Sequence, residues 1–469
     1  LGAPFRWLGH RGDPDKPPVL RAITALGPAY IKFGQLMSTR PDVVGGEMAQ
    51  ELRVLQDKLP PFSMEEAKSI IESEIGRPLE TIFSDFGEPI AAASIAQVHK
   101  ATLASTGEDV AVKVIRPGIG RAFRKDIDAF HFAANLIEVL SPSSRRLKPT
   151  DVISHFDQTT MGELDLRLEA AGASEYHDNT LKDEGFRVPK IYWNTSSRSV
   201  LTMEWVDGIA LGDRPALEAT GRDLDELGKR LLTMFLQHAL RDGYFHADLH
   251  QGNLKLGPNG DLVALDFGIM GRIDEYTRRV YAGILMGFVE RDYRRVAELH
   301  FEAGYVPADR DIDAFAQALR SVGEPIFGQD ASQISMARLL AHLFDVTERF
   351  GMETRLELIL LQRTMVVVEG VSRYLNPTLN IWNVAKPVVE DYIRTYLGPR
   401  AVVQDLTRTL QVVSRFGPRL PEIAENLLEL GLERPKPPSR RRFGVRRAVG
   451  WTLAGAVIAS ALWAGAVFL

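Results

Sequence analysis

The sequence contains no cysteine among its 469 residues. Disulfide bonds, thiolate metal ligands and cysteine nucleophiles are therefore excluded, and cysteine usage says nothing about the redox compartment. An excess of basic charge is also missing, because 56 Lys and Arg residues face 61 Asp and Glu residues, for a net charge of -5. This balance gives no general attraction to nucleic acid, and we expect no nucleic-acid partner. No secretory signal peptide is recognisable in the sequence.

The rest of the composition is that of a globular protein. Hydrophobic residues make up 45% of the chain and charged residues 25%, over a length that allows two or three domains. A chain of this size can bury a large apolar core.

The stretch 448–469 is an exception, because it has no charged residue and is mostly apolar. About 20 such residues span a bilayer as a helix. Clustered arginines before a span favour the cytoplasmic side, so we expect a single-pass C-terminal transmembrane helix with a cytoplasmic body. The alternative is an alanine-rich helix buried in protein. The flanking arginines are Arg440, Arg441, Arg442, Arg446 and Arg447.

The most informative stretch is His246–Asn253, which reads H-A-D-L-H-Q-G-N and is followed by Asp266-Phe267-Gly268. Asp248 and Asn253 are five residues apart, and a predicted hairpin separates them from Asp266. In phosphoryl transfer one carboxylate meets the attacking hydroxyl, while an amide and a second carboxylate hold the metal ion. Each piece alone is weak, because Asp and Asn are also common turn residues. Their order and spacing together indicate a kinase-like site.

Two β-strands are predicted upstream, at 90–98 and 110–115, with a turn at Thr106-Gly107. The first contains Ala91-Ala92-Ala93-Ser94 where a kinase has a glycine-rich phosphate loop. Alanine disfavours positive φ, so a stiffer loop of different shape is expected. The second contains V-A-V-K ending at Lys113, which is close to the kinase V-A-I-K pattern. The alternative for Lys113 is an edge charge facing water.

A helical stretch from 163 to 170 offers an acidic partner for Lys113. Glu169 is the first choice and Glu163 the alternative, while acids such as Asp165 beside them also suit a solvated helix face. Further strands are predicted at 188–192 and 200–206. The second leads into Glu204-Trp205-Val206, where a kinase hinge would pair its backbone with adenine.

The segments on either side of the central stretch are predicted to be helical. Apolar spacing predicts a helix over 224–240 with Gly243 as its C-cap. A helix at 276–290 is predicted soon after Gly268. This leaves no room for the long activation segment that binds peptides in protein kinases. Its absence argues against protein substrates. Within the central stretch, Ala247 stands at the position where protein kinases have an arginine. Residues 291–430 are predicted to be almost wholly helical.

Near the N-terminus, residues 1–20 are predicted to be a loop and the following stretch helical. Lys32 and Gln35 are three residues apart and share one face of this helix, and spacing alone favours a solvated polar face. Ser63 and Glu66 form a capping-box pattern that predicts the start of another helix.

These motifs together make the chain resemble the UbiB/ABC1/ADCK family of atypical kinases, in particular its bacterial members, from about Leu20 to Tyr305. Lys32-Phe33-Gly34-Gln35 matches the family's K-x-G-Q motif, and 91–94 its alanine-rich loop. Glu163-Leu164-Asp165 matches its E-x-D motif, with Glu169 as partner of Lys113. Ala96 and Gln251 depart from a common glycine and a common proline beside these motifs. Members commonly end in two membrane helices, whereas only one fits here.

The resemblance implies an α+β, bilobal protein-kinase-like fold. It also implies ATP and Mg²⁺ as cofactors, and a role in ubiquinone biosynthesis with quinone-precursor lipids such as polyprenyl phenols as partners, at the bacterial inner membrane and beside other biosynthetic proteins. Lys32, Gln35, Glu163 and Asp165 are then implied to point into the active site. The expected domains are a helical extension 1–85, an N-lobe 86–206, a helical C-lobe 207–430, a Pro/Arg-rich linker 431–447 and the transmembrane helix 448–469.

Two other functions are compatible with the residues. One is a non-catalytic, lipid-handling scaffold whose conformation is switched by nucleotide. The other is a small-molecule kinase of the aminoglycoside or choline type, which rests on fold analogy alone.

Overall fold

The computed structural model describes residues 17–397, apart from 39–43, 45, 53–54, 56–59, 141–148, 328–341, 343–344, 347–348 and 353–355. The predicted linker and the predicted transmembrane helix at 448–469 lie outside the described residues. Among the helices that are described, none is long and apolar enough to cross a membrane. The domain boundaries expected from the sequence remain predictions.

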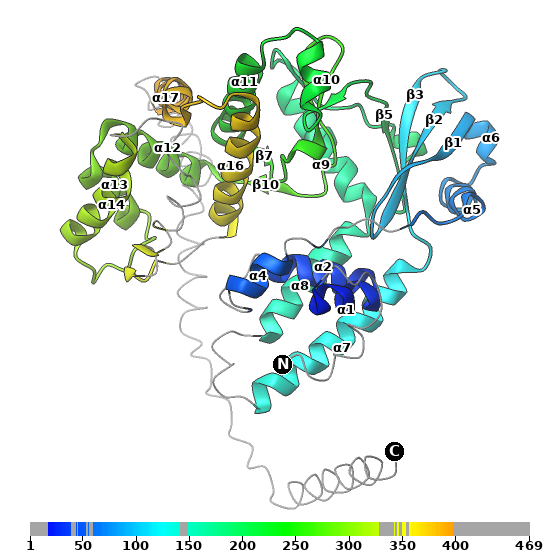
Figure 1. The fold of residues 1–469 in the computed structure, drawn as a ribbon, viewed down its shortest axis with the longest axis horizontal. Coiled ribbons are helices and arrows are strands. Elements are labelled where there is room, and N and C mark those ends of the chain that lie inside the picture. The colour runs from blue at the N-terminus through cyan, green and yellow to red at the C-terminus, as the bar shows by residue number, and fades with distance from the viewer. Residues whose placement is uncertain are drawn as a thin grey trace, which may run out of the picture. The chain divides into compact units, whose positions relative to one another are not determined.

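The N-terminal part is built on a four-stranded antiparallel sheet in the order β1-β2-β3-β5 (Figure 1). Val110, Val112 and Val114 alternate along β3 and are fully buried in a core shared with the helices α5 and α6. The capping box predicted at Ser63 and Glu66 is present at the start of α5. The elements are α5 Met64–Ile75, α6 Leu79–Ile82, β1 Phe83–Ala92, β2 Ala96–Leu103, β3 Asp109–Ile115 and β5 Val200–Glu204.

The strand predicted at 90–98 is wrong as one element, because β1 and β2 are two arms of a hairpin. The chain reverses at 93–95, where the Ala93 N–H donates to the Ala96 carbonyl. The sequence predicts a loop at 91–94, but not that this loop reverses the chain, because it contains no glycine or proline. The strand predicted at 188–192 is also wrong: β4 is Phe186–Arg187, and only Ile191 forms an isolated bridge with Met203.

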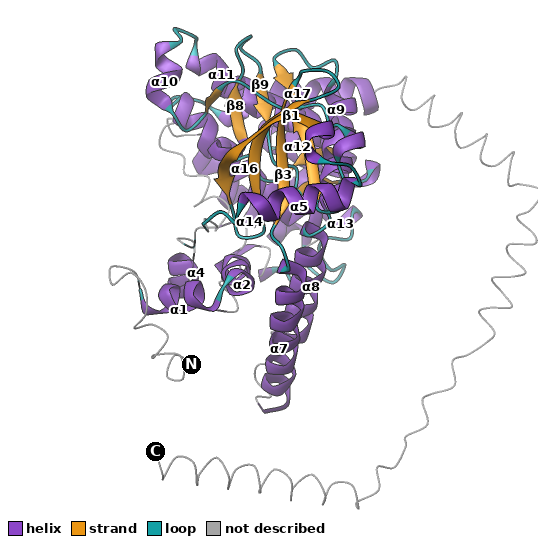
Figure 2. Ribbon diagram, turned by 90° about the vertical axis from the view of Figure 1, so that its right-hand side faces the viewer, coloured by secondary structure: helices purple, strands orange, loops and turns teal. Residues whose placement is uncertain are grey.

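Helices α7 and α8 run antiparallel to one another (Figure 2), since Glu138 near the end of α7 accepts a 3.0 Å bond from the Thr150 N–H at the start of α8. The helix α2 packs on this pair through Phe33, whose ring stacks on Phe130 at 4.8 Å. The loop predicted for 1–20 ends early, because α1 begins at Pro18. The elements are α1 Pro18–Leu26, α2 Pro28–Ser38, α4 Gly46–Leu52, α7 Ile119–Leu140, α8 Pro149–Glu163 and α9 Leu166–Thr180.

The C-terminal part is mostly helical and carries short strands in its loops. The predicted hairpin after Asn253 is present as β8 and β9. The helix α11 ends at Gln237 and continues as a π-helical turn, His238–Asp242, before Gly243 closes it with φ 64°. The strands are β6 Ile209–Ala210, β7 Tyr244–His246, β8 Leu254–Leu256, β9 Leu262–Ala264 and β10 Met270–Arg272.

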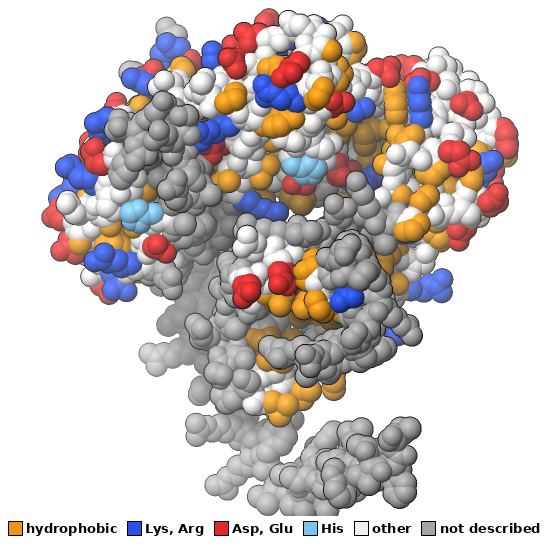
Figure 3. All heavy atoms as spheres, viewed as in Figure 1, with side chains coloured by type: hydrophobic (Ala, Val, Ile, Leu, Met, Phe, Trp, Pro, Cys, Tyr) orange, Lys and Arg blue, Asp and Glu red, His pale blue; other side chains and the backbone are white. Residues whose placement is uncertain are grey.

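The helices of this part form the core around α11, α16 and α17 and a second core around α13 and α14. Basic and acidic side chains are mixed over the visible face of α13 and α14 (Figure 3). On α13, Arg295 and Glu302 form an ion pair at 2.8 Å. The helices are α10 Arg214–Ala219, α11 Leu224–Gln237, α12 Glu275–Glu290, α13 Tyr293–Glu302, α14 Ile312–Phe327, α16 Leu356–Leu375 and α17 Ile381–Tyr392.

Candidate active site

Lys113 projects from β3 on the face opposite the buried valines. Its Nζ donates to both carboxylate oxygens of Glu169, at 2.8 and 2.9 Å. Glu169 lies in the first turn of α9 and is 8% exposed, so the ion pair joins the sheet to the helix in a nearly dry environment. Of the two glutamates considered from the sequence, Glu169 is the one that meets Lys113.

Asp266 lies beside this pair, two residues after β9. Its Oδ2 is 3.6 Å from the Lys113 Nζ, and its Oδ1 accepts a 3.2 Å bond from the Gly268 N–H. The backbone of Asp266 has φ 55°, in the left-handed region that aspartate tolerates only at some cost. The strained backbone and the local bond fix the carboxylate toward Lys113.

Asp248 lies in the loop that follows β7, and His246 sets the shape of that loop. The His246 Nδ1 accepts from the Asp248 N–H at 3.1 Å, and its Nε2 donates to the Leu265 carbonyl at 3.0 Å. Burial lowers the pKa of His246, which keeps the ring neutral as these two bonds require. One buried imidazole therefore holds the loop of Asp248 against the chain leading into Asp266.

Asn253 is tied to both loops. Its Nδ2 donates to the Asp248 carbonyl at 3.0 Å, and its own carbonyl accepts from the Leu265 N–H at 2.8 Å. The amide oxygen of Asn253 has no hydrogen-bond donor within the described residues and is available as an acceptor. Two protein oxygens completed by phosphate and water are the usual magnesium arrangement in nucleotide sites. The donor set fits Mg²⁺, although the described residues contain no cluster of three His, Asp or Glu ligands.

The charges at this site stabilise one another. Burial by itself would lower the pKa of Lys113, but the Asp266 and Glu169 carboxylates outweigh it and raise the pKa. Lys113 lowers the pKa of Asp266, whereas burial raises that of Glu169 against the opposing effect of Lys113. The site therefore presents a permanent cation beside an ionised Asp266, an arrangement suited to phosphate and a divalent ion.

The alanine-rich loop connects β1 to β2, and β2 pairs with the strand β3 that carries Lys113. Ala91 and Ala92 pair with Val98 and Gln97, so only the residues from Ala93 onward form the turn. No residue of this turn has a positive φ, as expected for alanine in place of glycine. The Ser94 hydroxyl is fully buried and has no hydrogen-bond partner within the described part of the chain. An orphaned donor in this position suits a phosphate oxygen.

The segment after β5 corresponds to the predicted hinge. The Glu204 carboxylate forms an ion pair with Arg187, with 2.5 Å between Oε1 and Nη1. The Val206 carbonyl accepts a 3.0 Å hydrogen bond from the Lys255 Nζ. The Val206 N–H has no acceptor among the described residues. This leaves Val206, and not the Glu204 side chain, as the group able to meet a base edge.

The four residues expected to shape the pocket form three separate sets of contacts. Lys32 of α2 forms an ion pair with Glu163 at the end of α8, and its charge also lowers the pKa of Asp266. Gln35 donates a 3.4 Å bond to the Leu55 carbonyl. Asp165 caps α9 and pairs with Arg167 at 2.6 Å, so its carboxylate is used at the start of its own helix.

Comparison with known proteins decides the family. Residues 54–300 match the ABC1 atypical kinase-like domain and residues 319–380 the UbiB helical domain. A "Probable protein kinase UbiB" of Shewanella piezotolerans is 40% identical over 87% of this chain and 76% of its own length. That of Vibrio cholerae is 39% identical over 94% of this chain and 84% of its own.

The chain belongs to the UbiB family of ABC1 atypical kinase-like proteins. A solved structure, the complex of Rv3197 with erythromycin from Mycobacterium tuberculosis, matches with a TM-score of 0.56 over 76% of this chain and 90% of that one, at 23% identity. This likeness shows the fold, which is kinase-like and bilobal, with mixed helix and sheet.

Two residues of this UbiB-family chain that contact the site were not identified from the sequence. The Thr364 hydroxyl, in the UbiB helical domain, lies 3.0 Å from the Ala247 carbonyl and is 1% exposed. Tyr176, on α9, is packed edge-on against both His246 and Phe267. Neither belongs to a short motif, and no local pattern marks a side chain that meets a loop more than 60 residues away.

Proposed function

We propose that this UbiB-family protein is an Mg-ATP-dependent atypical kinase or ATPase that supports ubiquinone biosynthesis. The observation that carries the proposal is the approach of Lys113 to Asp266, next to a loop in which Asn253 is bonded to Asp248. Lys113, Asp266 and Asn253 come from three separate segments, and the first two have charged atoms 3.6 Å apart. The third is bonded to the backbone of Asp248. This arrangement suits a triphosphate with a divalent ion.

Each residue has a role in this proposal. Lys113, held by Glu169, would contact the α- and β-phosphates, and the oxygens of Asp266 and Asn253 would hold magnesium. The metal, when bound, neutralises charge on the phosphates. Asp248 would orient the attacking hydroxyl or water. Ala91, Ala92, Ala93 and Ser94 would lie over the phosphates, and Glu204 to Val206 along the base.

A lipid acceptor or activator is the substrate class we favour. Six residues, 269–274, separate Gly268 from α12, which leaves little chain to seat a peptide. The ion pair of Lys32 with Glu163 places the N-terminal helices near the same carboxylates. We expect polyprenyl-phenol or other quinone-precursor lipids, presented at the bacterial inner membrane with the kinase-like body in the cytoplasm, and contact with other ubiquinone-biosynthesis proteins.

The direct test is ATP turnover with radiolabelled ATP, with and without lipid extracts, using the Asp248→Asn protein as the blank. Magnesium-dependent turnover that disappears in Asp266→Asn and rises with a quinone-precursor lipid would support the proposal. Turnover that survives Asp266→Asn would contradict it.

A non-catalytic scaffold would give a different result in cells. Asp248→Asn and Lys113→Ala would be tested for rescue of a strain deficient in quinone synthesis. Failure of both variants, at normal protein levels, supports catalysis. Full rescue by both supports the scaffold.

A further inference from the structure

The turn between β1 and β2 is bonded to Arg116, a residue outside its own hairpin. The Arg116 Nε donates to the Ala93 carbonyl at 3.0 Å, and the Arg116 backbone N–H donates to the Ile95 carbonyl at 2.8 Å. Among the residues that the structure describes, these are the hydrogen bonds that reach the turn from beyond β1 and β2. Ser94 lies between the two bonded carbonyls, so the position of its buried hydroxyl depends on Arg116.

Arg116 follows β3 directly, which connects the turn to the strand of the phosphate-binding lysine. The strand ends at Ile115, and Lys113 lies three residues before Arg116. Lys113 and Ala91 both pair with Val98 of β2, from opposite sides of that strand. Residues that pair directly in an antiparallel sheet project to the same face. The alanine-rich segment therefore begins on the face of Lys113, and Arg116 holds the turn to which it leads.

The Arg116 guanidinium also contacts the segment 60–62, which precedes α5. Its Nη2 donates to the Pro60 carbonyl at 2.6 Å, and its Cζ lies 5.6 Å from the centroid of the Phe62 ring. This distance is within the range of a cation–π contact. A planar guanidinium can bind two carbonyls in fixed directions because it carries five N–H donors. One side chain thus joins the turn at 93–95 to the segment 60–62.

The segment 60–62 is in turn bonded to the sheet. The Gln97 Oε1 accepts from the Phe62 N–H at 2.9 Å, and the Gln97 Nε2 is 2.9 Å from the Nε2 of His99. Burial lowers the pKa of His99, and the Nδ1 of the neutral ring donates to the Gly87 carbonyl at 2.8 Å. The Nε2 of His99 is then the acceptor for Gln97. These buried bonds fix the segment 60–62 relative to β1 and β2.

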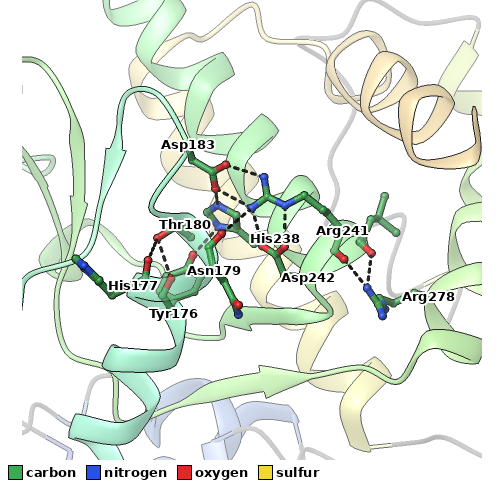
Figure 4. Close-up of polar contacts among 10 residues, drawn as sticks. Tyr176, His177, Asn179, Thr180, Asp183, His238, Arg241, Asp242 and Arg278 are labelled. Carbon is green, nitrogen blue, oxygen red and sulfur yellow. Dashed lines mark hydrogen bonds and ion pairs between the residues drawn. The ribbon is translucent and has the colours of Figure 1, made fainter. Parts of the chain in front are cut away.

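The helix α9, which holds the lysine through Glu169, is fixed independently of the turn (Figure 4). The Tyr176 hydroxyl of α9 is 2.6 Å from the Nδ1 of His238, whose Nε2 is 2.9 Å from the Oδ2 of Asp183. Arg241 donates to both oxygens of this aspartate, at 2.6 and 2.8 Å. A substitution that loosens the turn should therefore leave the ion pair on α9 in place.

We propose that Arg116 is a positioning residue for nucleotide binding: it holds the turn 93–95 over the phosphates by joining it to the segment 60–62. A turn that is ordered in advance binds its ligand at a smaller entropic cost. The inference rests on the proposed function for its nucleotide part. The anchoring of the turn does not, because it is a property of the folded chain.

The test compares Arg116→Met with Arg230→Met. Arg230 donates at 3.0 Å to the Gly260 carbonyl in the β8–β9 turn, so the control removes an arginine from the carbonyl of a different turn. The measurements on the full-length protein are KM and kcat for MgATP and the hydrogen exchange of the peptide covering 91–98. In Arg116→Met we expect KM to rise at least fivefold, kcat to change less than twofold, and this peptide to exchange at least fivefold faster. Arg230→Met should change none of the three.

Arg116→Lys separates positioning from charge. It keeps the positive charge but lacks the planar fork of donors, so we expect KM and exchange close to those of Arg116→Met. A normal KM in Arg116→Lys, with the peptide 91–98 still in fast exchange, would mean that the charge alone acts on the nucleotide, and would overturn the positioning role. Exchange in α11 should be the same in all variants, which checks that each one folds.

The two readouts separate the inference from the proposed function. Faster exchange of the turn in Arg116→Met, with a wild-type protein that does not turn over MgATP, would refute the proposed function and support the anchoring. Unchanged exchange, or an unchanged KM in an active protein, would refute the positioning role.

Discussion

The Thr364 hydroxyl of α16 lies 3.0 Å from the carbonyl oxygen of Ala247, the residue immediately before Asp248. It also lies 2.8 Å from the Leu360 carbonyl one turn back in its own helix, so a single proton is shared between the two acceptors. The helical domain at 319–380 therefore contacts the loop of Asp248 directly.

Thr364→Val keeps the shape of this side chain and removes the donor. The Ala247 carbonyl is then left without its side-chain donor, and we expect a loss of about 1–2 kcal/mol in the free energy of unfolding and a lower kcat. Urea unfolding and ATP turnover measure the two effects. Thr364→Ser, which retains the hydroxyl, is the control, and an equal loss of kcat in both variants would rule out the hydrogen bond as the cause.

Lys113 and Glu169 should be strongly coupled in stability. Lys113→Met leaves the 8%-exposed Glu169 carboxylate without its cation, and we expect a cost of about 3 kcal/mol, since breaking a buried pair strands a charge. The double variant Lys113→Met/Glu169→Gln should cost much less than the sum of the single variants. The measurement is a double-mutant cycle by urea unfolding. Additive losses would mean that the pair is not coupled in solution.

Nucleotide and metal should stabilise the fold through Asp266. Magnesium with ATP at about 100 times its dissociation constant should add about 2.7 kcal/mol to the free energy of unfolding, and thus raise the melting temperature. ATP with a chelator, or MgATP with Asp266→Asn, should give little shift. Asp261→Asn makes the same chemical change in the β8–β9 turn and should keep the full shift. A full shift with Asp266→Asn would exclude Asp266 as a metal ligand.

The stability of the protein should fall in mild acid because of His300. Burial lowers its pKa to about 4, and its Nδ1 donates to the Val296 carbonyl at 2.8 Å. An unfolded histidine has a pKa of about 6.5, so below that pH the unfolded chain binds a proton that the folded chain refuses. Stability is thus complete above pH 6.5 and is lost as pH falls toward 4, by about 3 kcal/mol. Urea unfolding of wild type and His300→Gln between pH 7 and 4.5 tests this, and equal slopes would contradict it.

The parts of the fold predictable from sequence were those with local signatures. Lys113 lies on β3, where valines alternate into the core, and the capping box at Ser63 and the left-handed cap at Gly243 are single-turn features. The hairpin after Asn253 is also local. The spacing of Asp248, Asn253 and Asp266 predicted that they belong to one site, since short loops cannot separate them far.

The parts that escaped prediction depend on contacts across the chain. The β1–β2 turn at Ala93 has no glycine or proline to mark it, and its reversal is stabilised by the pairing of whole strands. Asp165 lies in a family motif, and its carboxylate caps α9 by accepting from the backbone N–H and the guanidinium of Arg167. Tyr176 is one aromatic among many in the sequence, and only the folded chain reveals that its ring packs against His246.

Ala173 lies midway between Glu169 and Tyr176 on α9 and is fully buried. Because both contacts of this helix depend on its being continuous, a proline at this one position would break it between them. The ion pair of Glu169 with Lys113 and the packing of Tyr176 against His246 would then be lost together, although neither side chain had been changed. A substitution at Ala173, which has no polar or charged group, would therefore be expected to disrupt the candidate site. The residues of the site would all be present, but their relative positions would be wrong.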